Sequence, residues 1–211
     1  MSKVIQFPKM LRDAEVRAQS FDEATNTIDV VWTTGATVRR VSWADGEFDE
    51  ELVVDGSNVR LDRLNSGAPF LDTHSKWSLG DVLGSVVRGS ARIEGGKGLA
   101  KILLSNAADV VDRVAKIKEG VVSNISVGYR IHVVEKTERI GQTPLHRVVD
   151  WEPWEISAVP IPADAGAHVR SGEGVSETFA CRVMSGPATQ IELQRIRMRM
   201  AAAQNELVRS R

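Results

Sequence analysis

The chain has 211 residues, and its 27 Lys and Arg against 28 Asp and Glu give a formal net charge of −1. Its length suits one domain with a sizeable core, and the balanced charge argues against nucleic acid as a partner. The single cysteine, Cys181, excludes an intrachain disulfide framework or a multi-cysteine zinc site, and no apolar run is long enough to span a membrane, so we expect a soluble cytoplasmic protein.

The first part of the chain predicts two β-hairpins. Residues 27–32 and 37–43 are strand-like and flank a short connection that contains a glycine, which is typical of a hairpin turn. Residues 81–94 and 99–105 flank the sequence GGKG at 95–98, whose glycines can adopt the positive φ angles of a tight reversal. We therefore expect this half of the chain to be rich in strands.

An internal helix is predicted after the second hairpin. Ser105 or Asn106 can cap its first turn, and Gly120 stands where a left-handed residue commonly ends a helix. Its apolar residues recur at helical spacing, at Val110, Val111, Val114 and Ile117. We expect one face of this helix to pack on the sheet.

Two further strands are predicted at 121–135 and 145–161, on either side of a polar break at 138–143. Together with the preceding elements they complete a domain over residues 1–168. The next segment, 169–188, is rich in Gly, Ser, Glu and Pro and predicts a linker.

Residues 189–211 contain strong helix formers and no helix breaker, and several of them are arginines. We therefore predict a helical tail outside the main core, which could serve as a scaffold-like or docking segment.

The stretch SNISVGY at 123–129 contains Ser126 and Gly128 within a predicted strand. Glycine weakens a strand, and it often marks a place where another group approaches the backbone. Because side chains alternate along a strand, Ile125 and Val127 are expected to face the core, while Ser126 and Gly128 face the other, polar side. We expect room for a substrate beside the hydroxyl of Ser126.

A serine hydroxyl becomes a good nucleophile when a histidine can remove its proton. His132 lies six residues from Ser126, about 20 Å along a regular strand, and is too far away. His146 and His168 could approach only through a favourable topology. His74 follows the short apolar strand APFLD, where a side chain can project into a cleft. Ser126 with His74 is therefore the best candidate pair.

Several segments, in this order, resemble the caudovirus prohead serine proteases, which mature the capsids of tailed phages. The resemblance runs from about residue 27 to residue 170. The segments that carry it are LDRLNSGAPFLDTHS, LGSVV, GGKGLAKILLS, IKEGVVSNISVGYRI and VVDWEPWEISAVPIPADAGA.

The resemblance implies a β-rich α+β fold, similar to the assemblin β-barrel of herpesvirus proteases with surrounding helices. It also implies Ser126 as nucleophile and His74 as base, with Glu155 in the position of the family's acidic residue. In the herpesvirus relatives the third residue is a histidine, so His132 or His146 stays open for that role. Neither a cofactor nor a metal is expected.

The implied substrates are the phage major capsid protein, the scaffold and the protease chain itself, cut inside the procapsid in the host bacterial cytoplasm. Self-association as a homodimer or higher oligomer is also implied. The donors to the oxyanion stay open, with backbone amides near Ser126, Arg130 or Arg147 as candidates.

Three alternative functions remain open at this point. The first is a non-catalytic capsid or scaffold component with the same fold. The second is a small-molecule esterase that uses the same serine and histidine. The third is a metal enzyme, although the four histidines include no closely spaced pair such as H-E-x-x-H.

Overall fold

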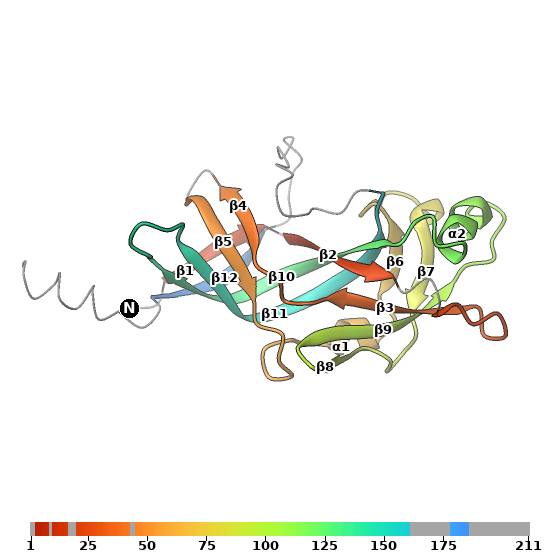
Figure 1. Cartoon of the computed structure of the whole chain (residues 1–211), viewed down its shortest axis with the longest axis horizontal. Helices are drawn as coiled ribbons and strands as arrows, with labels where there is room; N and C mark the ends of the chain where they lie inside the picture. The colour runs from red at the N-terminus through yellow and green to blue at the C-terminus, as the bar shows by residue number, and fades with distance from the viewer. Residues whose placement is uncertain (1–2, 9, 17–19, 43–44, 161–177, 186–211) are drawn as a thin grey trace, which may run out of the picture.

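The computed structural model describes residues 3–8, 10–16, 20–42, 45–160 and 178–185 (Figure 1). The strands are β1 (Lys3–Pro8), β2 (Met10–Val16), β3 (Thr27–Thr33), β4 (Val38–Ser42), β5 (Gly46–Leu52), β6 (Pro69–Asp72), β7 (Val82–Val86), β8 (Arg92–Glu94), β9 (Lys97–Leu104), β10 (Asn124–Thr137), β11 (Leu145–Ala158) and β12 (Thr178–Ser185). The helices in these residues are α1 (Asp62–Asn65), α2 (Val111–Lys118) and a single 3₁₀ turn at Leu79–Asp81.

The strands form one mixed sheet in the order β1-β12-β10-β2-β3-β9-β7-β6-β11-β5-β4, with β8 paired to β9 off this path. The strand-rich class predicted from the sequence is confirmed. The sheet is open, because β1 and β4 lie at its two ends, and this corrects the prediction of a closed assemblin-like barrel. Nor do helices surround the described part of the sheet, since α1 and α2 are both short.

An additional pairing of β10 with β11 joins two strands that are far apart in that order. These are the longest strands of the described chain, and the two strands predicted around the polar break prove to form an antiparallel hairpin. The sheet stays open at β1 and β4, but the strands from β10 through β2, β3, β9, β7 and β6 to β11 pair in a ring, with β12 and β1 on one side and β5 and β4 on the other outside it. In Figure 1 the two strands run side by side through the centre of the molecule.

Alternation along β10 places its apolar residues in the core. Ile125, Val127 and Tyr129 are buried, as the periodicity predicts. Tyr129 packs edge to face on Trp151 of β11 at 5.6 Å between ring centroids, and Trp151 packs similarly on Trp32 of β3 at 5.9 Å. These aromatic contacts fix the distance between strands that the sequence places far apart.

The second predicted hairpin is confirmed at its turn, but its first strand, predicted over 81–94, is divided into β7 and β8. The first predicted hairpin is wrong. β8 and β9 turn through Gly95 and Gly96, which both have positive φ. In contrast, β3 pairs with β2 and β9, and β4 pairs with β5, so the strands at 27–32 and 37–43 are not partners. Local turn signals could not reveal this, because the partners of β3 are set by packing of distant segments.

Helix α2 lies where it was predicted, but it starts later. Val110, Val114 and Ile117 are buried, and Gly120 after its end has a φ of 77°. The predicted N-cap is wrong, because the capping position is Val110 and no side chain caps the helix. Neither helix of the described residues has the length and apolar character of a membrane span.

Strand β12 lies within the segment 169–188 that was predicted to be a linker. It pairs antiparallel with β1 and parallel with β10. Its Cys181 is buried, and burial raises the pKa of the thiol to about 11, so the thiol stays protonated at neutral pH. The rest of the predicted linker and the predicted tail at 189–211 lie outside the described residues.

His146 near the start of β11 is a core residue with 4% of its surface exposed. Its ring stacks on Phe48 at 4.0 Å between centroids. Burial, helped by the positive charge of Lys136, lowers the pKa of His146 to about 4, while Asp45 and Glu50 oppose the shift. The folded protein therefore holds this histidine neutral.

We predict that His146 makes folding stability depend on pH. The unfolded state gains a proton as the pH falls through 6.5, whereas the folded state gains it only near pH 4. The contribution of His146 to the free energy of unfolding is therefore fully present above pH 6.5. It is lost as the pH falls from 6.5 to about 4, by up to about 3 kcal/mol in total. Urea unfolding at several pH values should show a smaller loss for His146→Gln than for the unchanged chain. Equal losses would contradict this prediction.

Candidate active site

Ser126 lies in β10, between β11 on one side and β2 on the other. Its register partners are Ser157 on β11 and Asp13 on β2. Residues directly opposite in an antiparallel pair share a face, with Cβ atoms about 4.5–5.5 Å apart. The side chains of Ser126 and Ser157 are therefore neighbours on one face of the sheet.

The same row of the sheet continues from β11 to β6. Ser157 is in register with Leu71, and Ala158 with Asp72, the last residue of β6. The chain leaves β6 directly after this pair and turns at Thr73 and His74. This topology explains how a histidine more than fifty positions from Ser126 reaches its neighbourhood.

The turn after β6 is held in a left-handed conformation that is uncommon for residues other than glycine. Thr73 has a φ of 48° and His74 a φ of 62°. A β-branched residue such as Thr73 is strained in this region. Two hydrogen bonds tie the turn to β11: Thr73 N–H donates to the carbonyl of Ala158 at 2.9 Å, and His74 N–H donates to Ser157 Oγ at 3.2 Å.

The imidazole of His74 contacts the carboxylate of Glu155, with 2.7 Å between Nδ1 and Oε1. The other carboxylate oxygen, Oε2, accepts a hydrogen bond of 2.6 Å from Ser157 Oγ. An ionised carboxylate only accepts hydrogen bonds, so a neutral imidazole opposite it donates from Nδ1 and has its lone pair on Nε2. The contact thus favours the tautomer in which Nε2 is the basic nitrogen.

Glu155 and Ser157 share a face of β11 because they are two residues apart, and Gly128 of β10 is the register partner of Glu155. Ser126, Ser157 and Glu155 thus lie on one face of two paired strands, and His74 contacts two of them. The structure brings His74 and Glu155 into direct contact. It sets Ser126 beside Ser157, and Ser157 in turn contacts both His74 and Glu155.

The face that carries Ser126 is more buried than the sequence predicted. Ser126 is 2% exposed and Gly128 is also buried, whereas an open polar face had been expected. His74 is the most accessible member of the group, with 18% of its side chain exposed. Polar residues can occupy a buried face when they hydrogen bond to one another, which a pattern of alternating residues does not reveal.

The other histidines do not join this group. His132 lies beside Glu152, with 3.5 Å between Nε2 and Oε2, and burial, with the nearby charge of Arg60, lowers its pKa. His146 precedes Ser157 by eleven residues on the same strand, on the order of 30 Å away along its length. His168 lies outside the described residues.

The two arginines considered as oxyanion donors both have other partners. Arg130 lies 4.3 Å from the ring centre of Trp154 and 3.8 Å from Glu152. Arg147 lies near the far end of β11, within 3.6 Å of Glu51 and 3.7 Å of Glu135.

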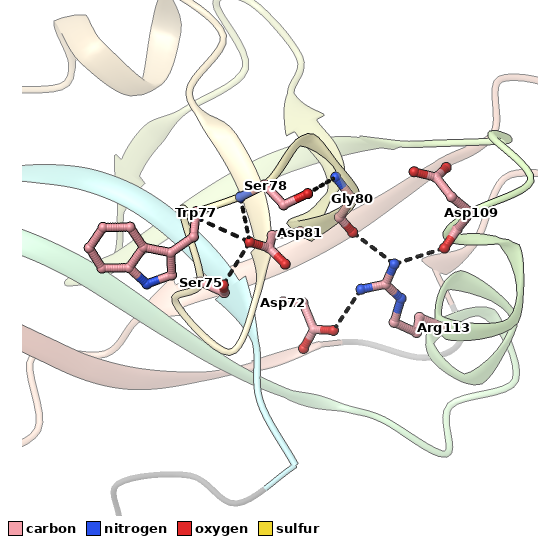
Figure 2. Close-up of polar contacts among 8 residues, drawn as sticks. All are labelled: Asp72, Ser75, Trp77, Ser78, Gly80, Asp81, Asp109 and Arg113. Atoms are coloured by element: carbon pink, nitrogen blue, oxygen red, sulfur yellow. Dashed lines mark hydrogen bonds and ion pairs between the residues drawn. The ribbon is translucent and has the colours of Figure 1, made fainter.

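The loop that follows His74 is organised by the carboxylate of Asp81 (Figure 2). Its Oδ2 accepts hydrogen bonds from Ser75 Oγ at 2.7 Å and from the N–H groups of Trp77 and Ser78 at 3.1 and 2.9 Å. These hydrogen bonds, that of Ser75 most of all, hold the pKa of Asp81 below its ordinary value. The carboxylate therefore stays charged at neutral pH.

Arg113 of α2 braces the same loop from the other side. It donates to Asp72 Oδ2 at 3.1 Å, to the carbonyl of Gly80 at 2.7 Å and to the carbonyl of Asp109 at 2.8 Å. Figure 2 shows its guanidinium between the end of β6 and the helix. The segment on which His74 sits is thus fixed at both ends.

Sequence reasoning missed Ser157, Asp81 and Arg113. A signal for Ser157 was present, because Glu155-x-Ser157 on a strand puts both side chains on one face. Asp81 and Arg113 carried no comparable signal, since each acts on atoms whose position depends on the folded loop. Within the part of the chain that the structure describes, no group of His, Cys, Asp and Glu side chains is arranged to hold a metal ion.

Comparison with known proteins agrees with the resemblance seen in the sequence. The family model described as caudovirus prohead serine protease matches residues 39–180, from β4 to β12. A protein named major capsid protein, from Halomonas phage phiHAP-1, is 29% identical over 133 residues. The match covers 62% of this chain and 22% of that longer protein. No solved structure matches the chain.

We predict that Asp81→Ala loosens the loop after His74, because three hydrogen bonds are lost together. Hydrogen exchange should show amide exchange of Trp77 and Ser78 that is faster by on the order of tenfold. Asp55→Ala is the matched control, since Asp55 likewise accepts hydrogen bonds from the N–H and hydroxyl of Ser57 in a separate loop. Unchanged exchange in the Asp81 variant would contradict the assigned role.

Proposed function

Because the chain belongs to the caudovirus prohead serine protease family, we propose that it is a serine endopeptidase that cuts phage assembly proteins during procapsid maturation. The observation that best supports this proposal is the contact of His74 with Glu155 beside the strand that carries Ser126. A histidine oriented by a carboxylate next to a serine is the arrangement that acyl transfer requires.

In the proposed reaction, Nε2 of His74 accepts the proton of Ser126 Oγ while Oγ bonds to the carbonyl carbon of a peptide. The imidazolium, stabilised by Glu155, then donates that proton to the leaving amine nitrogen as the C–N bond breaks. Water hydrolyses the resulting ester, with His74 again as the base, and Ser126 regains its proton.

Substrate access is part of the proposed mechanism. The reacting atoms must come within about 3 to 3.5 Å of one another, whereas Ser126 is 2% exposed. Binding of a peptide at the proposed site would therefore require that Ser126 become more accessible. We propose that the peptide approaches from the exposed side of His74.

The proposed substrates are the major capsid protein, the scaffold and the protease chain itself, inside the procapsid in the host cytoplasm. The relative named major capsid protein supports a link with capsid proteins. We also propose self-association of the enzyme. Cleavage of structural proteins within the procapsid would make its maturation irreversible.

The relative's name also favours a second candidate, a capsid or scaffold component that keeps the fold without cutting peptides. A third candidate, a small-molecule esterase, would use the same residues. If the chain is a capsid or scaffold component, processing should be independent of Ser126. If it is an esterase, it should hydrolyse esters without cleaving capsid precursor.

We predict that Ser126→Ala and His74→Ala abolish cleavage of capsid precursor and scaffold when these are produced together with the enzyme. Removal of either group should lower kcat by on the order of 10⁴-fold or more, because nucleophile and base act as a unit. Ser90→Ala is a matched control, since Ser90 Oγ also donates and accepts a hydrogen bond, with Lys101. Gel analysis and mass spectrometry would detect the products; continued cleavage by the Ser126 variant excludes it as nucleophile.

Variants of the candidate third catalytic residues, Glu155 and His132, test which of them orients His74. Glu155→Gln should lower kcat by on the order of 10³- to 10⁴-fold, because an amide favours the wrong imidazole tautomer. His132→Ala should stay within a few-fold of the unchanged enzyme, since His132 contacts Glu152 instead. The reverse result would assign the third role to His132.

A further inference from the structure

Ser157 is a fully buried serine at the centre of the candidate site. Its hydroxyl donates to Glu155 Oε2 at 2.6 Å and accepts from the backbone N–H of His74 at 3.2 Å. It is also the register partner of Ser126. One hydroxyl thus touches both the carboxylate and the residue that the carboxylate orients.

The two hydrogen bonds of Ser157 fix different parts of the His74–Glu155 contact. The bond from Oγ holds the carboxylate at Oε2, so that Oε1 faces the imidazole. The bond from His74 N–H holds the backbone of a residue with a φ of 62°, a conformation that other contacts must maintain. Loss of the hydroxyl would remove one hydrogen bond from the histidine backbone and one from its carboxylate partner.

On the basis of the proposed function, we propose that Ser157 is a positioning residue that aligns His74 with Ser126 through both its hydrogen bonds. Ser157 transfers no proton in the reaction and contacts no substrate. It sets the direction in which Nε2 of His74 points, by holding the backbone of His74 and the carboxylate that binds Nδ1. A misalignment of about 1 Å at such a group can cost on the order of 100-fold in rate.

A serine with a purely packing role would behave differently. Cysteine is somewhat larger than serine and donates and accepts hydrogen bonds weakly, whereas threonine keeps the hydroxyl and adds one methyl group. A packing role tolerates Ser157→Cys, while a positioning role does not. Ser157→Thr should restore the hydrogen bonds, because threonine is well suited to a strand.

The variants can be compared on a synthetic peptide that spans a cleavage site mapped in the capsid precursor. We expect kcat of Ser157→Ala and Ser157→Cys to fall by on the order of 10- to 100-fold with KM nearly unchanged. Ser157→Thr should remain within a few-fold of the unchanged enzyme, as should Ser90→Ala. Thermal unfolding of each variant, measured alongside, shows that the folded protein is being compared.

Nuclear magnetic resonance of the His74 ring provides a readout that does not depend on cleavage. Its Nδ1 proton should be protected from solvent in the unchanged chain and exchange faster in Ser157→Ala, but not in Ser90→Ala. Full kcat in Ser157→Ala, wild-type kcat in Ser157→Cys, or unchanged exchange of the Nδ1 proton would overturn the inference. If the unchanged chain cleaves no substrate, the protease function fails, while the exchange experiment still decides the role of Ser157.

Discussion

The register of β10 against β11 is the constraint on which the candidate site depends. It sets Ser126 opposite Ser157 and Gly128 opposite Glu155. A slip of one residue would turn every side chain of one strand to the other face, and the serine would enter the apolar core. The buried residues on the opposite face, Ile125 and Val127 among them, favour this register because a slip would expose them. The stability of the core and the geometry of the polar group therefore have the same origin.

Burial of a carboxylate imposes a second condition. Glu155 is almost inaccessible to solvent, and an ionised group in such a place must be compensated by hydrogen bonds. Ser157 and His74 both supply them. Because His74 comes from a strained turn, its contact with Glu155 is also one of the interactions that keep the turn in place. The same contacts thus satisfy the carboxylate and orient the imidazole.

The parts of this molecule that sequence could predict are those governed by local patterns. Alternation identified β10 and β11, two glycines identified the β8–β9 turn, and the glycine beside Ser126 drew attention to the serine. Glu155 came from family resemblance, since a glutamate between Trp154 and Ile156 carries no signal of its own. The partners of β3 and the burial of Ser126 could not be predicted, because both result from strands that meet only in the folded chain.

The same limit applies to the support around His74. The position of His74 at the end of an apolar strand was readable, but the carboxylate of Asp81 collects its hydrogen bonds only after the loop has closed. Arg113 reaches that loop from a helix more than thirty positions later in the sequence. Long-range contacts of this kind produce no recognisable pattern of residue spacing in a single sequence.

Strand β10 has a neighbour on each side at Ser126, since β2 pairs with it there as well as β11. Its backbone amide and carbonyl groups are thus already committed to ladders within the chain. Under the proposed function, a substrate peptide could not bind beside Ser126 as an additional strand of the sheet. Such a peptide would have to approach across a face of the sheet, where His74 is the exposed member of the group, and bind through groups other than the main chain of β10.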